Sequence, residues 1–320
     1  MYLYSNILGT FVFSQNFEIR EKVLFSDSEA VKNSGLLSKG EVLDTEKKFL
    51  ERFKSITNLR EKPDEKALEK IDSVFSGMQE EFYEKNLLVT RHQIKDAVTN
   101  DMLIIQASSS SEEIGKAINL LVKRLREWYS YILPEMEAKI TDHEKFVDLI
   151  LHKERHDLVK EFNVKHGMGV DLPKHDSDAV IHLAKAINSL MKEKNEKEKY
   201  LESLMKKECP NTTEVAGFLI GAKLISIAGS MRNFILMPSS TIQLLGAEKA
   251  LFRHMLNKNS RPPKHGEIIN HPLLQRVQRE YKGKAARALS DKILLAAKID
   301  YFKGEFIGDR LRKELEAKFP

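Results

Sequence analysis

GAKLISIAGSMRNFILMPSSTIQLLGAEKALFR, residues 221–253, is an apolar stretch in which charges are few and regularly placed. A PSST run that begins at Pro238 separates two apolar segments and is a helix-start signal, and Gly246 interrupts the second segment. After this glycine, Lys249 and Arg253 stand four residues apart, so both lie on one face of a helix. Lys and Arg are rarely buried without a partner, so this spacing favours two side chains directed at an anionic partner, with a solvated helix face as the alternative.

Charge is distributed unevenly along the chain. The formal net charge is +5, but residues 211–320 carry 19 Lys and Arg against 10 Asp and Glu, a net charge of +9. The first 210 residues therefore have a net charge of −4. A strongly basic third is typical of a protein that binds a polyanion, so we expect a polyanionic partner on the C-terminal third.

Composition indicates a soluble protein rich in helices and excludes disordered and collagen-like classes. The chain has 320 residues, of which 42% are hydrophobic and 31% charged, enough for two or three domains with their own cores. The single cysteine, Cys209, excludes an internal disulfide and favours a reducing compartment. Residues 1–13 lack signal-peptide features, and the apolar stretch 215–228 predicts a buried helix that is too short to span a bilayer. We therefore expect a cytoplasmic protein with no membrane partner.

Residues 1–110 are expected to form a small α/β domain. Short apolar runs separated by turn residues predict strands, and two later segments have helical spacing. The predicted strands lie within residues 2–13, at 22–25 and at 86–89, and the predicted helices at 41–54 and 63–74. No Gly-rich phosphate loop follows these strands and no catalytic pair stands out, so the residues of this domain indicate no enzymatic function.

Residues 111–209 are expected to form a long antiparallel helical hairpin, a coiled coil. Ser110 and Glu113 follow a serine-rich joint and have the spacing of a capping box, which predicts the start of the first helix; the second is predicted over residues 179–208. A two-helix hairpin buries little apolar surface alone, so we expect it to pack on a second copy, with an intramolecular bundle as the alternative. The candidate dimerisation residues are Ile118, Leu121, Leu125, Ile187, Leu190 and Leu201.

Residues 210–320 are expected to form an all-α domain, which makes the predicted fold mainly α. Pro210, Asn211 and Glu214 indicate a helix boundary with another capping-box spacing. Glycine-marked turns then separate short helices, and basic side chains beside such turns can reach phosphates that a smooth helix face cannot. These basic residues include Arg261, Lys264, Arg276, Arg279, Lys282, Lys284 and Arg287.

The same domain carries no recognisable catalytic or metal site. His254, His265 and His271 lack a cysteine pair or a regular spacing, so no zinc site is expected. Ser239 and Ser240 have no general base beside them, and helix capping explains them. The domain also lacks the motifs of common sequence readers, which favours recognition of RNA shape over sequence.

The order of these motifs closely resembles the Nop domain signature. The matching segments are GAKLI (221–225), AGS (228–230), PSSTIQLLGAEKALFR (238–253), KHG (264–266), His271 and GKAARAL (283–289), with looser matches at 126–129 and 209–211. On these residues the chain is similar to the archaeal Nop-family core proteins of C/D box small ribonucleoproteins. Those proteins scaffold guide-directed RNA 2'-O-methylation.

The resemblance implies a scaffold, not an enzyme, that uses no cofactor and no metal. The N-terminal domain would dock the methyltransferase fibrillarin, and the hairpin would join two copies. The C-terminal domain would bind a kink-turn of C/D box guide RNA that already carries a small ribosomal-type kink-turn-binding protein. The residues implied at that RNA and protein surface are Gln243, Gly246, Ala247, Glu248, Lys249, Phe252, Arg253, His271, Lys284 and Arg287. For His271 a packed position is the alternative.

Three other functions stay open at this point. A splicing-type Nop-domain protein that binds snRNA would share the C-terminal domain. A general basic RNA chaperone would bind any RNA with a salt dependence set by its phosphate contacts, whereas the scaffold would bind bare RNA poorly. An RNA-modifying enzyme would need an unrecognised site in the N-terminal domain.

Overall fold

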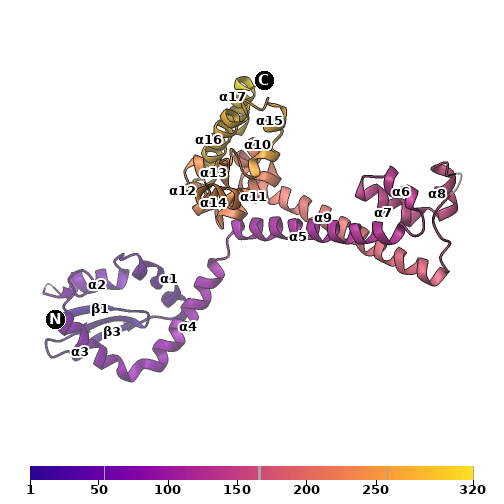
Figure 1. The fold of residues 1–320 in the computed structure, drawn as a ribbon. Helices are drawn as coiled ribbons and strands as arrows, with labels where there is room; N and C mark the ends of the chain where they lie inside the picture. Colours follow the sequence, from indigo (N-terminus) through magenta and orange to yellow (C-terminus); the bar gives the residue numbers. More distant parts are fainter. Residues whose placement is uncertain (54, 165–166, 258, 320) are drawn as a thin grey trace. The chain divides into compact units, whose positions relative to one another are not determined.

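The computed structural model describes residues 1–53, 55–164, 167–257 and 259–319. The chain divides into two compact units, Met1–Thr99 and Asn100–Pro320. The elements of the described residues are predominantly helices, and the strands among them form one small sheet near the N-terminus (Figure 1). The predicted fold class, mainly α with a small N-terminal α/β part, is confirmed.

The N-terminal unit is built on a four-stranded sheet with the order β3-β2-β1-β4. The strands are β1 (Tyr2–Ser5), β2 (Gly9–Phe13), β3 (Ile19–Leu24) and β4 (Thr57–Asn58). β2 pairs antiparallel with both β1 and β3, and β4 adds parallel to β1. All of β2 is buried because its side chains alternate between two cores. Phe11 and Phe13 pack with Ile71 in one core, and Val12 packs with Phe49 in the other.

The helices of this unit correct part of the sequence prediction. They are α1 (Asp27–Ser38), α2 (Asp44–Arg52), α3 (Glu65–Phe75), η1 (Ser76–Met78) and α4 (Gln79–Asp96). The predicted helices at 41–54 and 63–74 appear as α2 and α3, but the strand predicted at 86–89 lies inside α4. A short apolar run does not distinguish strand from helix. Val89 of that run is buried in a small core with Ala30 of α1.

The second unit contains the predicted hairpin, formed by α5 (Asn100–Tyr129) and α9 (Lys174–Glu208). α5 does not start after Ser110 as predicted, because it runs unbroken through the serine-rich segment. Tertiary contacts use these serines instead: the Ser111 hydroxyl donates to Glu198 Oε1 at 3.3 Å, and the Ser109 and Ser226 hydroxyls lie 3.3 Å apart. Ser110, the predicted cap, therefore lies inside α5 and not at its start.

Three short helices cover the distal end of the hairpin, α6 (Pro134–Lys139), α7 (His143–His152) and α8 (Arg155–Glu161). Phe146 and Leu158 from these helices pack against the hairpin residues Leu125 and Ile187. Arg126 is buried here, with Nη1 donating to the Ile140 carbonyl at 2.8 Å and the guanidinium 4.2 Å from the Phe146 ring centroid. The distal end is therefore a packed core of its own.

The C-terminal helices surround α16, whose alanine-rich face is fully buried. The helices of this part of the chain, with α16 among them, are α10 (Pro210–Ala216), α11 (Phe218–Ala228), α12 (Met231–Leu236), α13 (Ser239–Leu244), α14 (Glu248–Leu256), η2 (Glu267–Asn270), α15 (Pro272–Arg276), α16 (Lys282–Tyr301) and α17 (Gly308–Lys318). The helix predicted over 215–228 is split, because Gly217 takes φ = +79° between α10 and α11. None of the described helices combines the length and the apolar character that crossing a membrane requires.

Two predicted caps in this region are wrong. α10 starts at Pro210 as expected, but its N-cap is Cys209 without a side-chain hydrogen bond, and Asn211 is buried against Asp300 instead. α13 likewise starts at Ser239 as expected, yet no side-chain cap is formed there. In both cases proline sets the helix start, as the N-cap itself before α13 and as the first helical residue in α10.

Candidate RNA and protein interface

The turn between α13 and α14 is clamped by the segment that precedes η2. The Gln243 side-chain amide donates to the Lys264 carbonyl at 2.7 Å. The Gly266 amide donates to the Gln243 carbonyl and the Glu267 amide to the Leu245 carbonyl, each at 2.8 Å. Gln243, predicted at the RNA and protein surface, thus uses its amide group and its carbonyl to hold this turn. The KHG segment acquires a structural role as the clamp.

Glycine is required on both sides of this clamp. Gly246 takes φ = +86°, a conformation that side chains rarely adopt, and its amide donates to Glu248 Oε1 at 2.7 Å. A Cβ on Gly266 would lie 1.8 Å from the Leu245 carbonyl oxygen. Ala247 follows as the half-buried N-cap residue of α14. The conformation of this turn is therefore fixed by the chain itself, before any partner binds.

α14 has no buried residue along its whole length. Lys249 and Arg253 are exposed, and among the described residues neither makes an ion pair. Phe252 and Met255 are also exposed, and Leu256 is 90% exposed. A short helix is not stable by itself in water, and a contiguous exposed apolar surface marks an interaction site. α14 thus presents basic and apolar side chains together to a partner.

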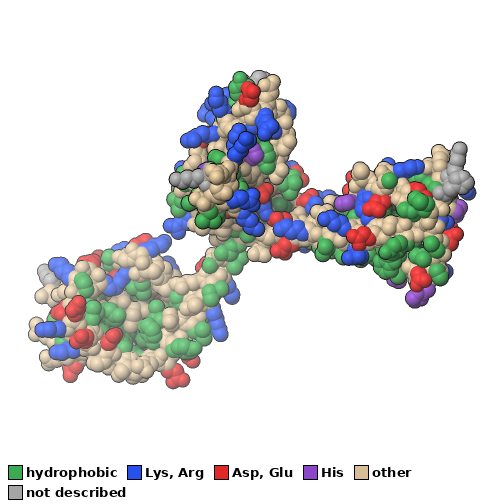
Figure 2. Space-filling model, viewed as in Figure 1, with side chains coloured by type: hydrophobic (Ala, Val, Ile, Leu, Met, Phe, Trp, Pro, Cys, Tyr) green, Lys and Arg blue, Asp and Glu red, His purple; other side chains and the backbone are tan. Residues whose placement is uncertain are grey.

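The first turns of α16 present further basic side chains. Lys284 and Arg287, for which the resemblance implies a place at the RNA surface, are exposed there, and Lys284 Nζ lies 5.9 Å from the ring centroid of exposed Tyr281. Lys and Arg gather over this domain in Figure 2. The N-terminal end of a helix also carries a partial positive charge. This region is therefore suited to phosphate groups.

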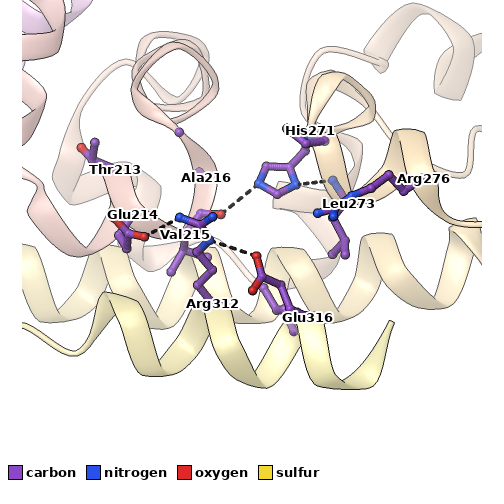
Figure 3. Close-up of a pocket in the computed structure, with 12 residues that line it drawn as sticks. Thr213, Glu214, Val215, Ala216, His271, Leu273, Arg276, Arg312 and Glu316 are labelled. Atoms are coloured by element: carbon purple, nitrogen blue, oxygen red, sulfur yellow. Dashed lines mark hydrogen bonds and ion pairs between the residues drawn. The ribbon is translucent and has the colours of Figure 1, made fainter. Parts of the chain in front are cut away.

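His271 takes the packed position that the sequence left as an alternative. Its Nδ1 accepts from the Leu273 amide at 3.2 Å and caps α15, while Nε2 lies 3.1 Å from the Val215 carbonyl at the end of α10 (Figure 3). Since a carbonyl only accepts, Nε2 carries the proton and the ring is neutral. Burial lowers the pKa of His271. Both ring nitrogens are used within the chain, so neither is left for RNA.

The cavity beside His271 is a joint between helices. It measures about 250 Å³, and three of its charged lining residues form ion pairs: Arg312 Nη1 lies 2.7 Å from Glu214 and Nε 3.1 Å from Glu316. Over the part of the chain that the structure describes, no group of three or more His, Cys, Asp or Glu could hold a metal ion. The candidate interface is formed by the clamped turn between α13 and α14 and by the exposed side chains of α14 and of the first turns of α16.

Replacement of His271 provides a test of its packed role. His271→Ala removes a helix cap and a hydrogen bond, so we expect the free energy of unfolding at pH 7.5 to fall by about 1–3 kcal/mol. A histidine whose pKa is lowered on folding stabilises the protein above its unfolded pKa near 6.5, and this contribution is lost as the pH falls below that value. Urea unfolding at pH 7.5 and 5.5 measures both effects.

A matched control separates His271 from the other titrating groups. The pKa of His265 is also lowered, mainly by burial. The urea unfolding of His265→Asn is therefore measured at the same two pH values. We expect the acid-induced loss to shrink in His271→Asn. An equal loss in wild type and His271→Asn would contradict the packed role.

The residues predicted for dimerisation lie in the cores of the single chain. Ile118, Leu125 and Ile187 are buried in the distal core, and Leu201 is buried in the core of the C-terminal helices. The half-buried Leu121 and Leu190 pack against the distal core. The apolar stripe that the sequence left without a partner is covered by α6 to α8 and by the C-terminal helices. A contact with a second copy would have to use the other side of the hairpin.

An apolar surface on the N-terminal unit was missed from the sequence. Tyr83, Leu87 and Ile94 of α4 are exposed, and their separation by 4 and 11 residues places them on one helix face. This helical spacing is the signal that could have revealed them, but the segment was predicted as a strand. The stripe is suited to a protein partner.

Comparisons with known proteins identify the family. Residues 110–320 match the Nop family, described as "snoRNA binding domain, fibrillarin". An uncharacterized NOP5 family protein of Methanocaldococcus jannaschii is 40% identical over 247 residues, which cover 72% of this chain and 59% of that protein. Nucleolar protein 56 of Saccharomyces cerevisiae is 32% identical over 277 residues, which cover 77% of this chain and 55% of the yeast protein. The chain thus spans about half the length of these relatives.

A solved structure, titled as a crystal structure of a fibrillarin/Nop5p complex, aligns with 99% of this chain and 98% of its own chain. Its TM-score is 0.43 and its sequence identity 21%. The family match covers well over half of the chain and includes α10 to α17 and the hairpin from residue 110 of α5 onward. The chain belongs to the Nop family.

Proposed function

We propose that this chain is a scaffold without catalytic activity of its own in a C/D box RNA-guided 2'-O-methylation complex. Its C-terminal domain (210–320) binds a kink-turn of guide RNA together with a kink-turn-binding protein, and its N-terminal domain (1–110) recruits a fibrillarin-type methyltransferase. The observation that carries this proposal is the clamped turn at Gly246 followed by α14, a helix without a single buried residue. The family description as a snoRNA binding domain supports it.

The mixed character of α14 favours a composite partner over bare RNA. Lys249 and Arg253 can pair with phosphates. Met255 and Leu256 are exposed as well, and the backbone of a bare RNA has few apolar groups for them to contact. A surface composed partly of RNA and partly of protein satisfies both kinds of side chain. The prearranged turn lowers the entropy lost on binding, because this backbone need not be ordered by the partner.

The scaffold contributes position instead of chemistry. A methyltransferase held on the same particle as its target ribose acts at a high effective concentration. No cofactor or metal of its own is needed for that role. We further propose that the protein is cytoplasmic. Two copies associate through the exposed side of the hairpin (111–209), where Leu120 and Tyr200 are apolar and uncovered.

The apolar stripe on α4 is proposed as the docking surface for the methyltransferase. Ile94→Asp places a charge on this stripe and leaves the buried Val89 untouched. We expect about tenfold or more weaker binding of fibrillarin and a matching loss of guide-directed methylation in a reconstituted complex. Methyl transfer from S-adenosylmethionine to guided RNA, with pull-down of the methyltransferase, measures both.

Gln93→Asp is the matched control, because it adds the same charge to an exposed position on another face of α4. This variant should bind and methylate like wild type. Methylation by the purified chain without fibrillarin would overturn the scaffold role. Unchanged docking of Ile94→Asp would overturn only the surface assigned to it.

A further inference from the structure

The distal end of the hairpin exposes an apolar patch that the family role described above does not use. The distal patch consists of Tyr131, Met168 and Val170, whose side chains are 67%, 78% and 60% exposed. Tyr131 follows α5, and the other two lie in the segment that leads into α9. The Val170 amide donates to the Tyr131 carbonyl at 2.8 Å, so the two parts lie side by side.

The segment that carries the patch is held in place by side chains beneath it. The Met168 amide donates to Glu135 Oε1 at 2.9 Å, and Arg155 donates to the carbonyls of Gly169 at 3.0 Å and Ile132 at 2.9 Å. A Cβ on Gly169 would lie 1.9 Å from the Ile132 carbonyl oxygen, so only glycine fits this crossing. The apolar side chains are therefore presented on a fixed backbone, which lowers the entropy lost when a partner binds.

A cavity of about 390 Å³ opens beside this segment. Its lining includes the apolar side chains of Ile132, Ile150 and Val180, with Tyr129 among them. Burial raises the pKa of Tyr129 to about 12, so its phenol stays neutral and can donate a hydrogen bond. The lining also contains charged side chains, those of Lys153, Glu154, Arg155 and Asp171. A cavity with an apolar wall next to an exposed apolar patch can receive an anchoring side chain of a partner.

The charge of the distal end selects the kind of partner. Residues 130–178 carry 11 Asp and Glu against 7 Lys and Arg, a net charge of −4, whereas residues 211–320 carry +9. Within the described part of the chain, four of these carboxylates pair with histidines and not with Lys or Arg. These pairs are Asp148 with His152, Glu154 and Asp157 with His156, and Asp176 with His175. Acidic and apolar side chains are mixed over this end in Figure 2.

We propose that the distal end of the hairpin docks a basic polypeptide. An apolar side chain of the partner enters the cavity, its neighbours cover the distal patch, and its Lys and Arg face the surrounding carboxylates. RNA is repelled by the same carboxylates, and the distal end of a second copy carries the same charge and is repelled as well.

Fluorescence anisotropy with the full chain tests this proposal at pH 7.5. The probe is a short fluorescein-labelled peptide of Lys and Arg around a central Phe-Leu pair, compared with the same peptide carrying Glu and with a single-stranded RNA. Met168→Lys combined with Val170→Lys reverses the character of the patch. Ser177→Phe fills the cavity, whose lining includes Ser177, without a change of charge. Leu236→Lys, at an exposed apolar position of α12 outside the distal end, is the matched control.

Of the three probes, we expect only the basic peptide to bind. Its affinity for either distal variant should be lower than for wild type by about tenfold or more, and its affinity for the control should be within about twofold of wild type. Circular dichroism melting shows whether each variant is folded. Equal binding to all folded variants, tighter binding of the RNA or the Glu peptide, or no binding of the basic peptide would overturn the proposal. Two distinct variants keep the test decisive if one of them fails to fold.

Discussion

Asp300→Ala is expected to lower the free energy of unfolding of the second unit by about 3–5 kcal/mol. Asp300 is only 4% exposed and accepts four hydrogen bonds at the start of α10. The Asn211 amide and side chain donate to Oδ1 at 3.0 and 2.9 Å, and the Thr212 amide and hydroxyl donate to Oδ2 at 2.8 and 2.7 Å. Removal of the carboxylate leaves these donors buried without an acceptor, which costs more than the loss of exposed hydrogen bonds.

Chemical unfolding followed by circular dichroism measures this effect. Asp309→Ala, at an exposed position of α17, is the control and is expected to change stability by less than about 0.5 kcal/mol. Asp300→Asn keeps the shape but turns an amide donor towards other donors, so it should destabilise as well. A loss below about 1 kcal/mol for Asp300→Ala would show that the contact does not hold α10 against α16.

The second large effect is expected on RNA binding. Lys249→Ala combined with Arg287→Ala should weaken binding to the kink-turn RNA and protein complex by about a hundredfold or more, since two charge-assisted contacts of about 1.5–3 kcal/mol each are removed. Both side chains are exposed, so neither change should reduce stability by much. If both contacts are to phosphates, the dependence of log affinity on log salt should also become shallower by about two.

Lys298→Ala combined with Lys313→Ala is the matched control. It removes the same charge from exposed positions of α16 and α17, outside the proposed interface. A change of less than about threefold is expected for this control. An equal loss in the two double variants, measured by gel-shift titration, would mean that charge attracts RNA to the domain without a defined interface.

The sequence predicted elements well where the pattern is local. β1, β2, part of β3, α2, α3 and most of α9 follow from spacing and turn residues, whereas the two-residue β4 and α1 were not predicted. The predicted helix caps are wrong where the helix begins earlier in the sequence or where a distant side chain binds the predicted capping residue. Ser110, the predicted cap, lies inside α5, and Asn211 bonds to Asp300, a partner 89 residues away that no local pattern reveals. The resemblance pointed to the motif at residues 209–211, but only the structure shows its role, which is a buried hydrogen-bonded contact with Asp300.

The candidate interface shows the same limit. The Nop signature placed the important residues in sequence but did not say which way they face. Lys249 and Arg287 face solvent, while Gln243 and His271 hold the domain together through Lys264, 21 residues away, and Val215, 56 residues away. Those contacts depend on how helices pack around α16, and spacing along the chain does not specify it. The exposed stripe on α4 was missed because its helix was not recognised.

The most direct test of the scaffold account is a gel-shift titration of the wild-type chain on one kink-turn RNA, with and without the kink-turn-binding protein already bound. The account predicts strong binding to the preformed complex and weak binding to the bare RNA, because α14 presents apolar side chains that RNA alone does not cover. Equal affinity for both would contradict composite recognition. The chain would then act as a general basic RNA-binding protein.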